Sequence, residues 1–200
     1  KIKGESLGNV HFAIDYLTNP EAYDLGETVA VIGAGNSAID AARTAIRKGA
    51  RRVTIYGRRR SAGTSQRELE YAEIDGVEFV YGKAPLELTE AGPIFKTVEY
   101  DEAGNVTEIP DSTELYPADS IIIAISQGPR DYIVNTTTGI DTNNRGLVVT
   151  NDCGLTSRPG VFASGDVVKG ARTVVEAVKY SKLVADAMDH YMQGLTLPCE

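Results

Sequence analysis

The spacing of apolar residues predicts alternating strands and helices over the first 125 positions. Three runs of β-branched and apolar residues have the length of strands and lie at 28–32, 52–56 and 77–81. The stretches after the first two runs place apolar residues at helical spacing and end at Gly49 and at Asp75-Gly76. A continuous apolar run at 118–125 is typical of a strand that is buried on both faces.

Short apolar runs with tight turns lie between the third strand and the buried run. They occur at 86–88, 94–100 and 106–109, with glycine-containing turns at 90–93 and 102–105. This pattern predicts an antiparallel β-meander. The order βαβαβ, meander, β therefore predicts an α/β fold, a Rossmann-like, three-layer, dinucleotide-binding domain.

Both ends of the chain are predicted to carry a helix. Residues 5–17 have the pattern of a turn and a short amphipathic helix, which Asn19-Pro20 ends. A long helix is predicted at about 172–192, after a short apolar strand at 161–163. These last segments follow the meander domain and are assigned to a different one.

Composition narrows the class of protein. A net charge of −8 and a pI near 4.9 argue against a nucleic-acid partner, which clustered Lys and Arg would bind. No apolar run approaches the roughly 18 residues of a membrane helix, and the opening KIKGESLG lacks a signal-peptide pattern. Cys153 and Cys199 form no CxxC motif, so we predict reduced thiols in a cytoplasmic protein. His11 and His190 lack metal-ligand spacing, and we predict neither a metal site nor a catalytic side chain.

A glycine-rich loop, Gly33-Ala34-Gly35-Asn36-Ser37-Ala38, joins the first strand to the first helix. In this G-x-G-x-x-A pattern the first glycine permits a tight turn and the second lets the backbone approach a pyrophosphate. Amide groups at the helix start favour phosphate binding. Because the loop follows a strand, opens a helix and leads to a second strand, it predicts a dinucleotide site.

The end of the second strand favours NADP(H) over NAD(H). An NAD site would place Asp or Glu there, to bind the ribose 2′-hydroxyl. This chain places Arg58, Arg59 and Arg60 there, and guanidinium groups suit a 2′-phosphate. Arg67, on the following helix, has two open roles: it reaches the same phosphate, or it pairs with a nearby glutamate.

Three ordered motifs resemble the small (β) subunit of NADPH-dependent glutamate synthase and its relatives, which include the matching region of dihydropyrimidine dehydrogenase. They are VAVIGAGNSAIDAARTAIRKGARRVTIYGRRR, ADSIIIAISQGPR and TSRPGVFASGDVVKGARTVVEAVKYSKLVADAM. In that family an inserted NADPH domain splits the FAD domain. The resemblance therefore implies a linker and FAD-domain remnant at 1–24, an NADPH-binding domain at 25–127 and the C-terminal part of the split FAD domain at 128–200.

The resemblance also implies an activity for the parent protein. NADPH would reduce FAD, and electrons would pass through 4Fe–4S clusters to a large partner subunit that makes glutamate from glutamine nitrogen and 2-oxoglutarate. By position, Gly33, Gly35, Asn36 and Ser37 would hold the NADPH pyrophosphate, and Arg58 and Arg59 its 2′-phosphate. Gly165 and Asp166 would meet the FAD pyrophosphate and ribityl chain, with Thr173-Val174 beside the flavin.

Two features depart from the family pattern. Ser126 stands where such proteins usually have a glycine, and the sequence contains neither the FAD fold's own GxGxxG unit nor the cysteine-rich segments for the clusters. VFASGD at 161–166 is thus interpreted as the second half of an FAD site. We expect NADPH binding without tight FAD binding or turnover. Apolar strand surface at 121–125 and 161–163 is expected to be exposed and to favour self-association.

Two other functions stay open. One is a non-catalytic NADP(H)-binding or interaction module, in which the helix at 172–192 docks a partner. The other is a related flavin oxidoreductase with a different acceptor, such as a pyrimidine or ferredoxin.

Overall fold

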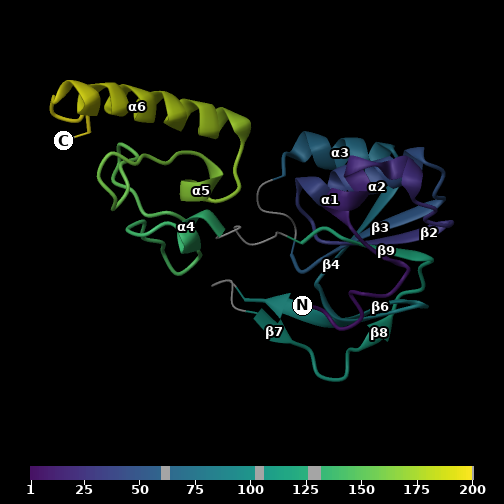
Figure 1. Ribbon diagram of the computed structural model, residues 1–200. Helices are drawn as coiled ribbons and strands as arrows, with labels where there is room; N and C mark the ends of the chain where they lie inside the picture. Colours follow the sequence, from purple (N-terminus) through teal and green to yellow (C-terminus); the bar gives the residue numbers. More distant parts are fainter. Residues whose placement is uncertain (60–63, 102–105, 126–131, 200) are drawn as a thin grey trace. The chain divides into compact units, whose positions relative to one another are not determined.

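The computed structural model describes residues 1–59, 64–101, 106–125 and 132–199 (Figure 1). The chain divides into two units, Lys1–Ser126 and Gln127–Glu200. Arg60 and Ser126, which the sequence singled out, lie outside the described residues. No helix in the described part of the chain is long and apolar enough to cross a membrane.

A parallel sheet of order β1-β9-β2-β3-β4 is the centre of unit 1. Its strands are β1 (Val10–Phe12), β2 (Thr28–Ile32), β3 (Arg52–Gly57), β4 (Val77–Tyr81) and β9 (Ser120–Ile123). Strands β2 and β9 are buried on both faces, as expected for β-branched, continuously apolar segments in the middle of a parallel sheet.

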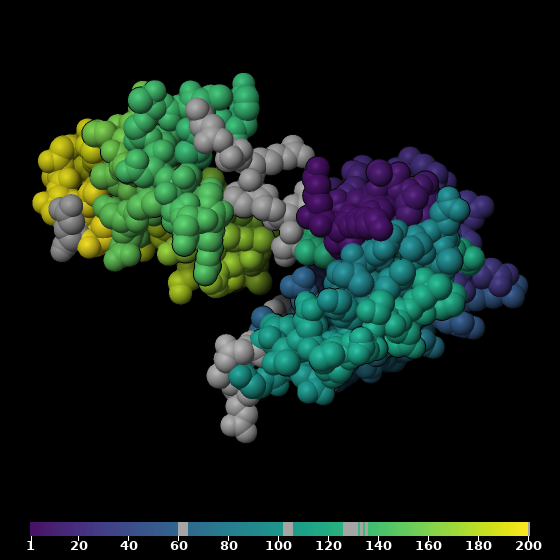
Figure 2. All heavy atoms as spheres, turned by 90° about the horizontal axis from the view of Figure 1, so that it is seen from below, coloured from purple at the N-terminus to yellow at the C-terminus, as the bar shows by residue number. Residues whose placement is uncertain are grey.

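Two further layers cover this sheet (Figure 1). Helices α1 (Ala13–Thr18), α2 (Asn36–Arg47) and α3 (Gln66–Ile74) lie on one face, and the 3-10 turn η1 (Pro20–Ala22) follows α1. An antiparallel meander of β5 (Lys83–Thr89), β6 (Gly92–Tyr100), β7 (Val106–Glu108) and β8 (Glu114–Leu115) covers the other. Figure 2 views unit 1 from below and shows the teal atoms of the meander on that face. The predicted three-layer α/β fold is confirmed.

The alternation of side chains along each strand gives unit 1 two cores. Val29 and Val31 of β2 face the helices, where α2 presents alanines that let it pack close to the sheet. Ala30 and Ile32 face the meander instead. There Phe95 is fully buried and stacks on Tyr56 with ring centroids 4.7 Å apart.

Strand β1 changes the expected edge of the sheet. The sequence predicts only a turn and a helix at 5–17, but Val10–Phe12 pairs in parallel with Ile121–Ile123 of β9. The prediction that the strand at 121–125 exposes apolar surface is therefore wrong for Ile121–Ile123, which are at most 6% exposed. Only Ile125, beyond the end of β9, is exposed.

Unit 2 contains α4 (Tyr132–Thr136), α5 (Asp166–Lys169) and the long helix α6 (Val174–Gln193). The predicted strand at 161–163 is wrong, since Phe162 makes a single bridge with Leu155 and no ladder extends from it. Three consecutive apolar residues are long enough for a short strand, but they do not guarantee that a partner strand lies beside them. The segment instead leads through Gly165 into the short helix α5.

A disulfide joins Cys153 to Cys199, with a Cα–Cα distance of 5.7 Å. The prediction of reduced thiols is therefore wrong for this structure. Helix α6 ends at Gly194 in the left-handed conformation, and the chain then returns toward Cys153. Cys153 is fully buried against Ala187 and Leu197 in a small core of unit 2. The pairing joins residues 46 positions apart, a contact that sequence spacing does not reveal.

An ion pair ties the end of α3 to α2. Asp75 accepts hydrogen bonds from Arg43 Nε at 2.6 Å and from Arg47 Nη2 at 3.0 Å. The Arg43 hydrogen bond, aided by the Arg43 and Arg47 charges, lowers the pKa of Asp75 below its usual value. A carboxylate with a lowered folded-state pKa stabilises the fold above its unfolded pKa of about 4, and that contribution is lost as pH falls through the folded pKa.

We expect Asp75→Asn to be less stable than the wild type at neutral pH and to lose less stability on acidification. Urea unfolding of both proteins at several pH values between about 6 and 2 measures this difference. The two free energies of unfolding should converge as Asp75 becomes protonated in the folded wild type. Parallel profiles over the whole range would contradict the assignment.

Candidate nucleotide-binding site

Gly33 shapes the turn between β2 and α2. Its φ is +125°, and a Cβ atom there would lie 2.5 Å from the carbonyl oxygen of Ala124. Its amide donates to the carbonyl of Tyr56 at 2.9 Å. Only glycine combines this backbone conformation with so close an approach. The glycine loop is thus held against the ends of both β3 and β9.

The start of α2 is open to a ligand. Its N-cap is Gly35, and no side chain of the described chain caps the helix. The amides of Asn36 and Ser37 have no acceptor among the described residues. A Cβ atom at Gly35 would meet nothing within 4 Å. Unsatisfied amides and the helix dipole make such an end suitable for an anion.

A pocket of about 410 Å³ lies at the carboxyl ends of the parallel strands. It is lined by Ile32, Gly33, Ala34, Gly35, Tyr56, Arg58, Arg59, Lys83, Pro85, Ala124 and Ile125. These lining residues include three cations and no carboxylate. The pocket therefore sets positive charge beside the glycine loop, which suits a phosphate-bearing ligand. Asn36 and Ser37, whose amides are open, directly follow Gly35 but are not among the residues that line the pocket.

The two arginines after β3 lie in this pocket. A Cβ atom at Gly57 would be 2.9 Å from that of Ala34, so the arginine turn is packed against the glycine loop. The guanidinium of Arg59 lies over the ring of Tyr100, 5.1 Å from its centroid. Neither Arg58 nor Arg59 forms an ion pair with any described residue.

Arg67 does not line the pocket, and its described interactions are with Tyr71. Its Nε donates to the Tyr71 hydroxyl at 3.0 Å, and its guanidinium lies 5.4 Å from the ring centroid. This contact is neither of the two roles that the sequence left open for Arg67, and it leaves a role at the phosphate untested.

Lys83 is a pocket residue that sequence reasoning missed. Its ammonium donates to Thr97 Oγ1 at 3.2 Å and to Glu114 Oε2 at 3.4 Å, and it lies 5.0 Å from the ring centroid of Tyr116. Burial opposes the charged ammonium, but Tyr116 and Glu114 outweigh it and raise the pKa of Lys83. A short hydrogen bond from the Tyr116 hydroxyl lowers the pKa of Glu114. No spacing rule places a lysine of a meander at a nucleotide site.

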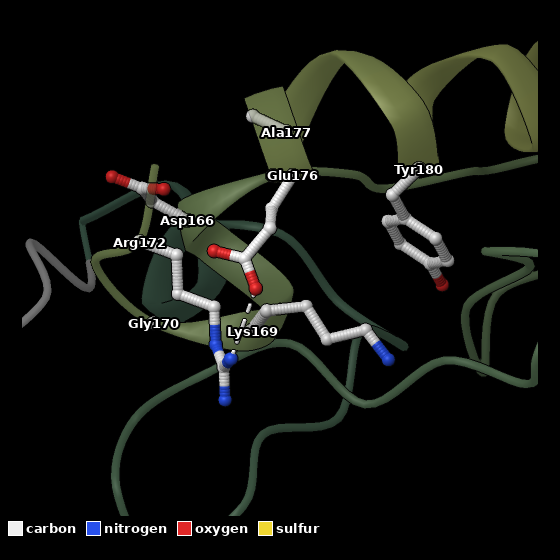
Figure 3. A pocket seen from close by; sticks show the side chains of 8 residues that line it. Asp166, Lys169, Gly170, Arg172, Glu176, Ala177 and Tyr180 are labelled. Carbon is white, nitrogen blue, oxygen red and sulfur yellow. Dashed lines mark hydrogen bonds and ion pairs between the residues drawn. The ribbon is translucent and has the colours of Figure 1, made fainter. Parts of the chain in front are cut away.

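Unit 2 has a pocket of its own, of about 280 Å³ (Figure 3). Gly165 and Asp166, two of the residues predicted to meet FAD, line it together with Lys169, Arg172, Glu176 and Tyr180. Figure 3 shows Asp166 and Lys169 on α5, Arg172 on the loop that follows it, and Glu176 and Tyr180 on the first turns of α6. The Lys169 ammonium lies over the ring of Tyr180, 4.8 Å from its centroid. Unlike the pocket of unit 1, this one brings carboxylates and cations together. The described residues contain no cluster of three or more side chains suited to a metal ion.

Thr173 and Val174, also predicted to lie beside the flavin, stand at the start of α6. The Thr173 hydroxyl accepts from the Glu176 amide at 3.3 Å, and the Glu176 carboxylate accepts from the Thr173 amide and hydroxyl. Arg172 pairs with the same carboxylate at 3.2 Å. Val174 is 78% exposed. This capping box satisfies the amides of Thr173 and Glu176, whereas no described side chain caps the start of α2.

The parallel sheet, the glycine loop and the pocket at the carboxyl ends of the strands make unit 1 a Rossmann-like domain. The chain matches the pyridine nucleotide-disulphide oxidoreductase family over residues 1–181, and it belongs to that family. The matched region covers unit 1 and most of unit 2.

Two relatives and one solved structure illustrate the similarity. The chain is 38% identical to the β subunit of NADP⁺-dependent formate dehydrogenase of Moorella thermoacetica, over 86% of this chain and 26% of that protein. It is 32% identical to the small chain of NADPH glutamate synthase of Halomonas elongata, over 94% of this chain and 46% of that one. Its fold is similar to that of T. acidophilum thioredoxin reductase, with a TM-score of 0.71 at 21% identity, covering 98% and 62% of the two chains. The chain thus spans about half the length of its glutamate synthase relative and less of the formate dehydrogenase subunit.

The two glycines of the loop have different structural requirements, which makes them a matched pair. We expect Gly33→Ala to destabilise unit 1 by about 1–3 kcal/mol, because its φ is positive and the new methyl group meets the Ala124 carbonyl. Gly35→Ala should change the free energy of unfolding by less than about 0.5 kcal/mol, since its N-cap position is extended and open. Denaturant unfolding without ligand checks both values, and equal losses would contradict this account of the turn.

Proposed function

We propose that unit 1 binds NADPH in the pocket between the glycine loop and the meander. The observation that carries this proposal is the pairing of an uncapped α2 with two arginines that have no ion-pair partner among the described residues. In this proposal, Gly33, Gly35, Asn36 and Ser37 hold the pyrophosphate at the start of α2. Arg58 and Arg59 hold the 2′-phosphate at the end of β3, and Arg67 would reach the same phosphate with the N–H groups that do not bond Tyr71.

The charge of the pocket supports NADP(H) over NAD(H). A 2′-hydroxyl is recognised by a carboxylate at the end of the second strand, whereas a 2′-phosphate needs positive charge there. The described lining has arginines at that position and no carboxylate. Guanidinium groups bind phosphate oxygens through paired, charge-assisted hydrogen bonds.

For unit 2 we propose a part of a split FAD site. In this assignment residues 1–24 are a linker and FAD-domain remnant, 25–127 the NADPH-binding domain and 128–200 the C-terminal FAD-domain segment. Gly165 and Asp166, which line the pocket of unit 2, would meet the FAD pyrophosphate and ribityl chain, with the Asp166 carboxylate accepting from ribityl hydroxyls. Thr173 and Val174 would lie beside the flavin at the start of α6. Membership of the pyridine nucleotide-disulphide oxidoreductase family supports the assignment.

The whole protein, in this proposal, moves electrons from NADPH through FAD to a partner, in the manner of glutamate synthase. Nicotinamide and flavin supply the hydride chemistry, and the protein orients them. The glutamate synthase relative is a small chain, which supports a large partner subunit as acceptor. We also propose 4Fe–4S clusters elsewhere in the parent and a cytoplasmic enzyme, as the sequence resemblance implies. The formate dehydrogenase relative supports a wider choice of redox partner, so a different acceptor is the second candidate function.

We expect Arg58→Ala and Arg59→Ala each to weaken NADPH binding by about tenfold or more and to leave NADH binding nearly unchanged. A charge-assisted hydrogen bond to phosphate contributes about 1.5–3 kcal/mol, which corresponds to this change. Calorimetric titration of both nucleotides measures it. Arg51→Ala is the matched control, because Arg51 is an exposed arginine that pairs with Glu27 and does not line the pocket. Equal losses for NADPH and NADH would argue against recognition of the 2′-phosphate.

We expect the 200-residue chain to bind NADPH without binding FAD tightly, and not to oxidise NADPH with a dye acceptor. At the start of α6 the Thr173 and Glu176 amides are already bonded within the capping box, and the Glu176 carboxylate would repel a pyrophosphate there. Titration with FAD and an absorbance assay of NADPH test the two expectations. Sustained NADPH oxidation, or FAD binding in the nanomolar range, would show that the chain completes a flavin site.

A further inference from the structure

We propose that Lys83 is a third phosphate-binding cation of the dinucleotide pocket and that Glu114 competes with the ligand for its ammonium. This inference rests on the proposed function and adds a residue and a means of tuning affinity. The ligand group is a phosphate of the dinucleotide, either the 2′-phosphate or the diphosphate.

The backbone places Lys83 beside the arginine turn. Gly82, with φ of +75°, turns the chain from β4 into β5, and its amide donates to the carbonyl of Arg58 at 3.2 Å. The carbonyl of Gly82 accepts from the amide of Val98 at 2.8 Å. Lys83 is therefore held at the point where the meander meets the end of β3, next to the predicted 2′-phosphate site.

The side chain of Lys83 is only 13% exposed and lines the same pocket as Gly35, Arg58 and Arg59. Its carboxylate partner does not line the pocket, and the side chain of Glu114 is 60% exposed. Lys83 thus lines the pocket, and its counter-charge does not. In this proposal the ammonium exchanges Glu114 for a phosphate of the ligand that enters the pocket.

The contact with Glu114 is weak enough to be exchanged. At 3.4 Å it exceeds the 2.7–2.9 Å that charge-assisted N–H···O bonds usually adopt. Glu114 also has a second partner, because the Tyr116 hydroxyl donates to the same Oε2 atom at 2.6 Å. A phosphate oxygen would gain a full charge-assisted bond from Lys83, while Glu114 would keep its bond to Tyr116. Removing the Glu114 charge should then strengthen the binding of the ligand's phosphate to Lys83.

If Lys83 had only a structural role, the Lys83 and Glu114 substitutions would affect nucleotide binding differently. If the ion pair only holds β5 against β8, removing either partner weakens the meander, and both changes reduce nucleotide binding together. A phosphate-binding Lys83 that competes with Glu114 predicts changes of opposite sign. The two variants therefore separate the two roles.

The experiment is calorimetric titration of NADP⁺ and NAD⁺ into the full chain and four variants. We expect Lys83→Met to weaken NADP⁺ binding by about tenfold and Glu114→Gln to strengthen it by about two- to fivefold. In the double variant the Glu114→Gln effect should vanish, since the ammonium it releases is gone. Lys96→Met is the matched control, because Lys96 pairs with Glu108 on the same meander at 3.0 Å and lies outside the pocket. The affinity of this variant for NADP⁺ should equal that of the wild type. Urea unfolding of each variant identifies any loss of folding.

The outcomes are distinct. Loss confined to NADP⁺ assigns Lys83 to the 2′-phosphate, and equal loss for NAD⁺ assigns it to the diphosphate; both support the proposal. Unchanged affinity in folded Lys83→Met, or weaker binding in both single variants, overturns it. If Arg58→Ala weakens binding and Lys83→Met does not, only this inference fails. Absence of dinucleotide binding by the wild type would instead overturn the proposed function itself.

Discussion

The contact between Gly33 and the end of β9 is the constraint on which the pocket of unit 1 depends. Strands β3, β2 and β9 are parallel and in register, so their carboxyl ends meet at one edge of the sheet. At this edge the Gly33 amide bonds to Tyr56 of β3, while its α-carbon lies against Ala124 after β9. A side chain at Gly33 would push the loop away from both strands. The glycine loop, the arginine turn and Ile125 would then no longer share one pocket.

The starts of the three longest helices show how backbone amides are distributed between folding and binding. Helix α3 is capped by Ser65 and Glu68, and α6 by Thr173 and Glu176, each through a complete capping box. Helix α2 has a glycine in the equivalent place and no such cap within the described chain. A side-chain cap there would satisfy the same amides that a phosphate needs. Leaving α2 open lowers its own stability, and burial of its alanine face against the sheet compensates for this.

Much of this arrangement follows from local sequence, and the exceptions depend on distant partners. The strands at 28–32, 52–56 and 77–81 have β-branched or apolar patterns that specify them locally, and the structure has them within one residue of these bounds. Strand β1 has only three residues and forms by pairing with β9, so no local sequence pattern predicts it. Lys83 reaches the pocket because the register of β5 against β6 sets its position, and Cys153 meets Cys199 because the chain turns back after α6. The periodicity of apolar residues along the chain does not reveal such contacts between distant segments.

The electrostatics of the two pockets differ in a way that follows from the acidity of the chain. The net charge is −8, so the protein as a whole repels anions. A phosphate-bearing ligand must therefore meet positive charge at short range, where a pocket with poorly hydrated walls strengthens the interaction. Unit 1 lines its pocket with Arg58, Arg59 and Lys83 beside the glycine loop, and Glu114 is not part of that lining. Unit 2 instead sets Asp166 and Glu176 among its cations, so its pocket suits hydroxyl groups better than a second dense negative charge.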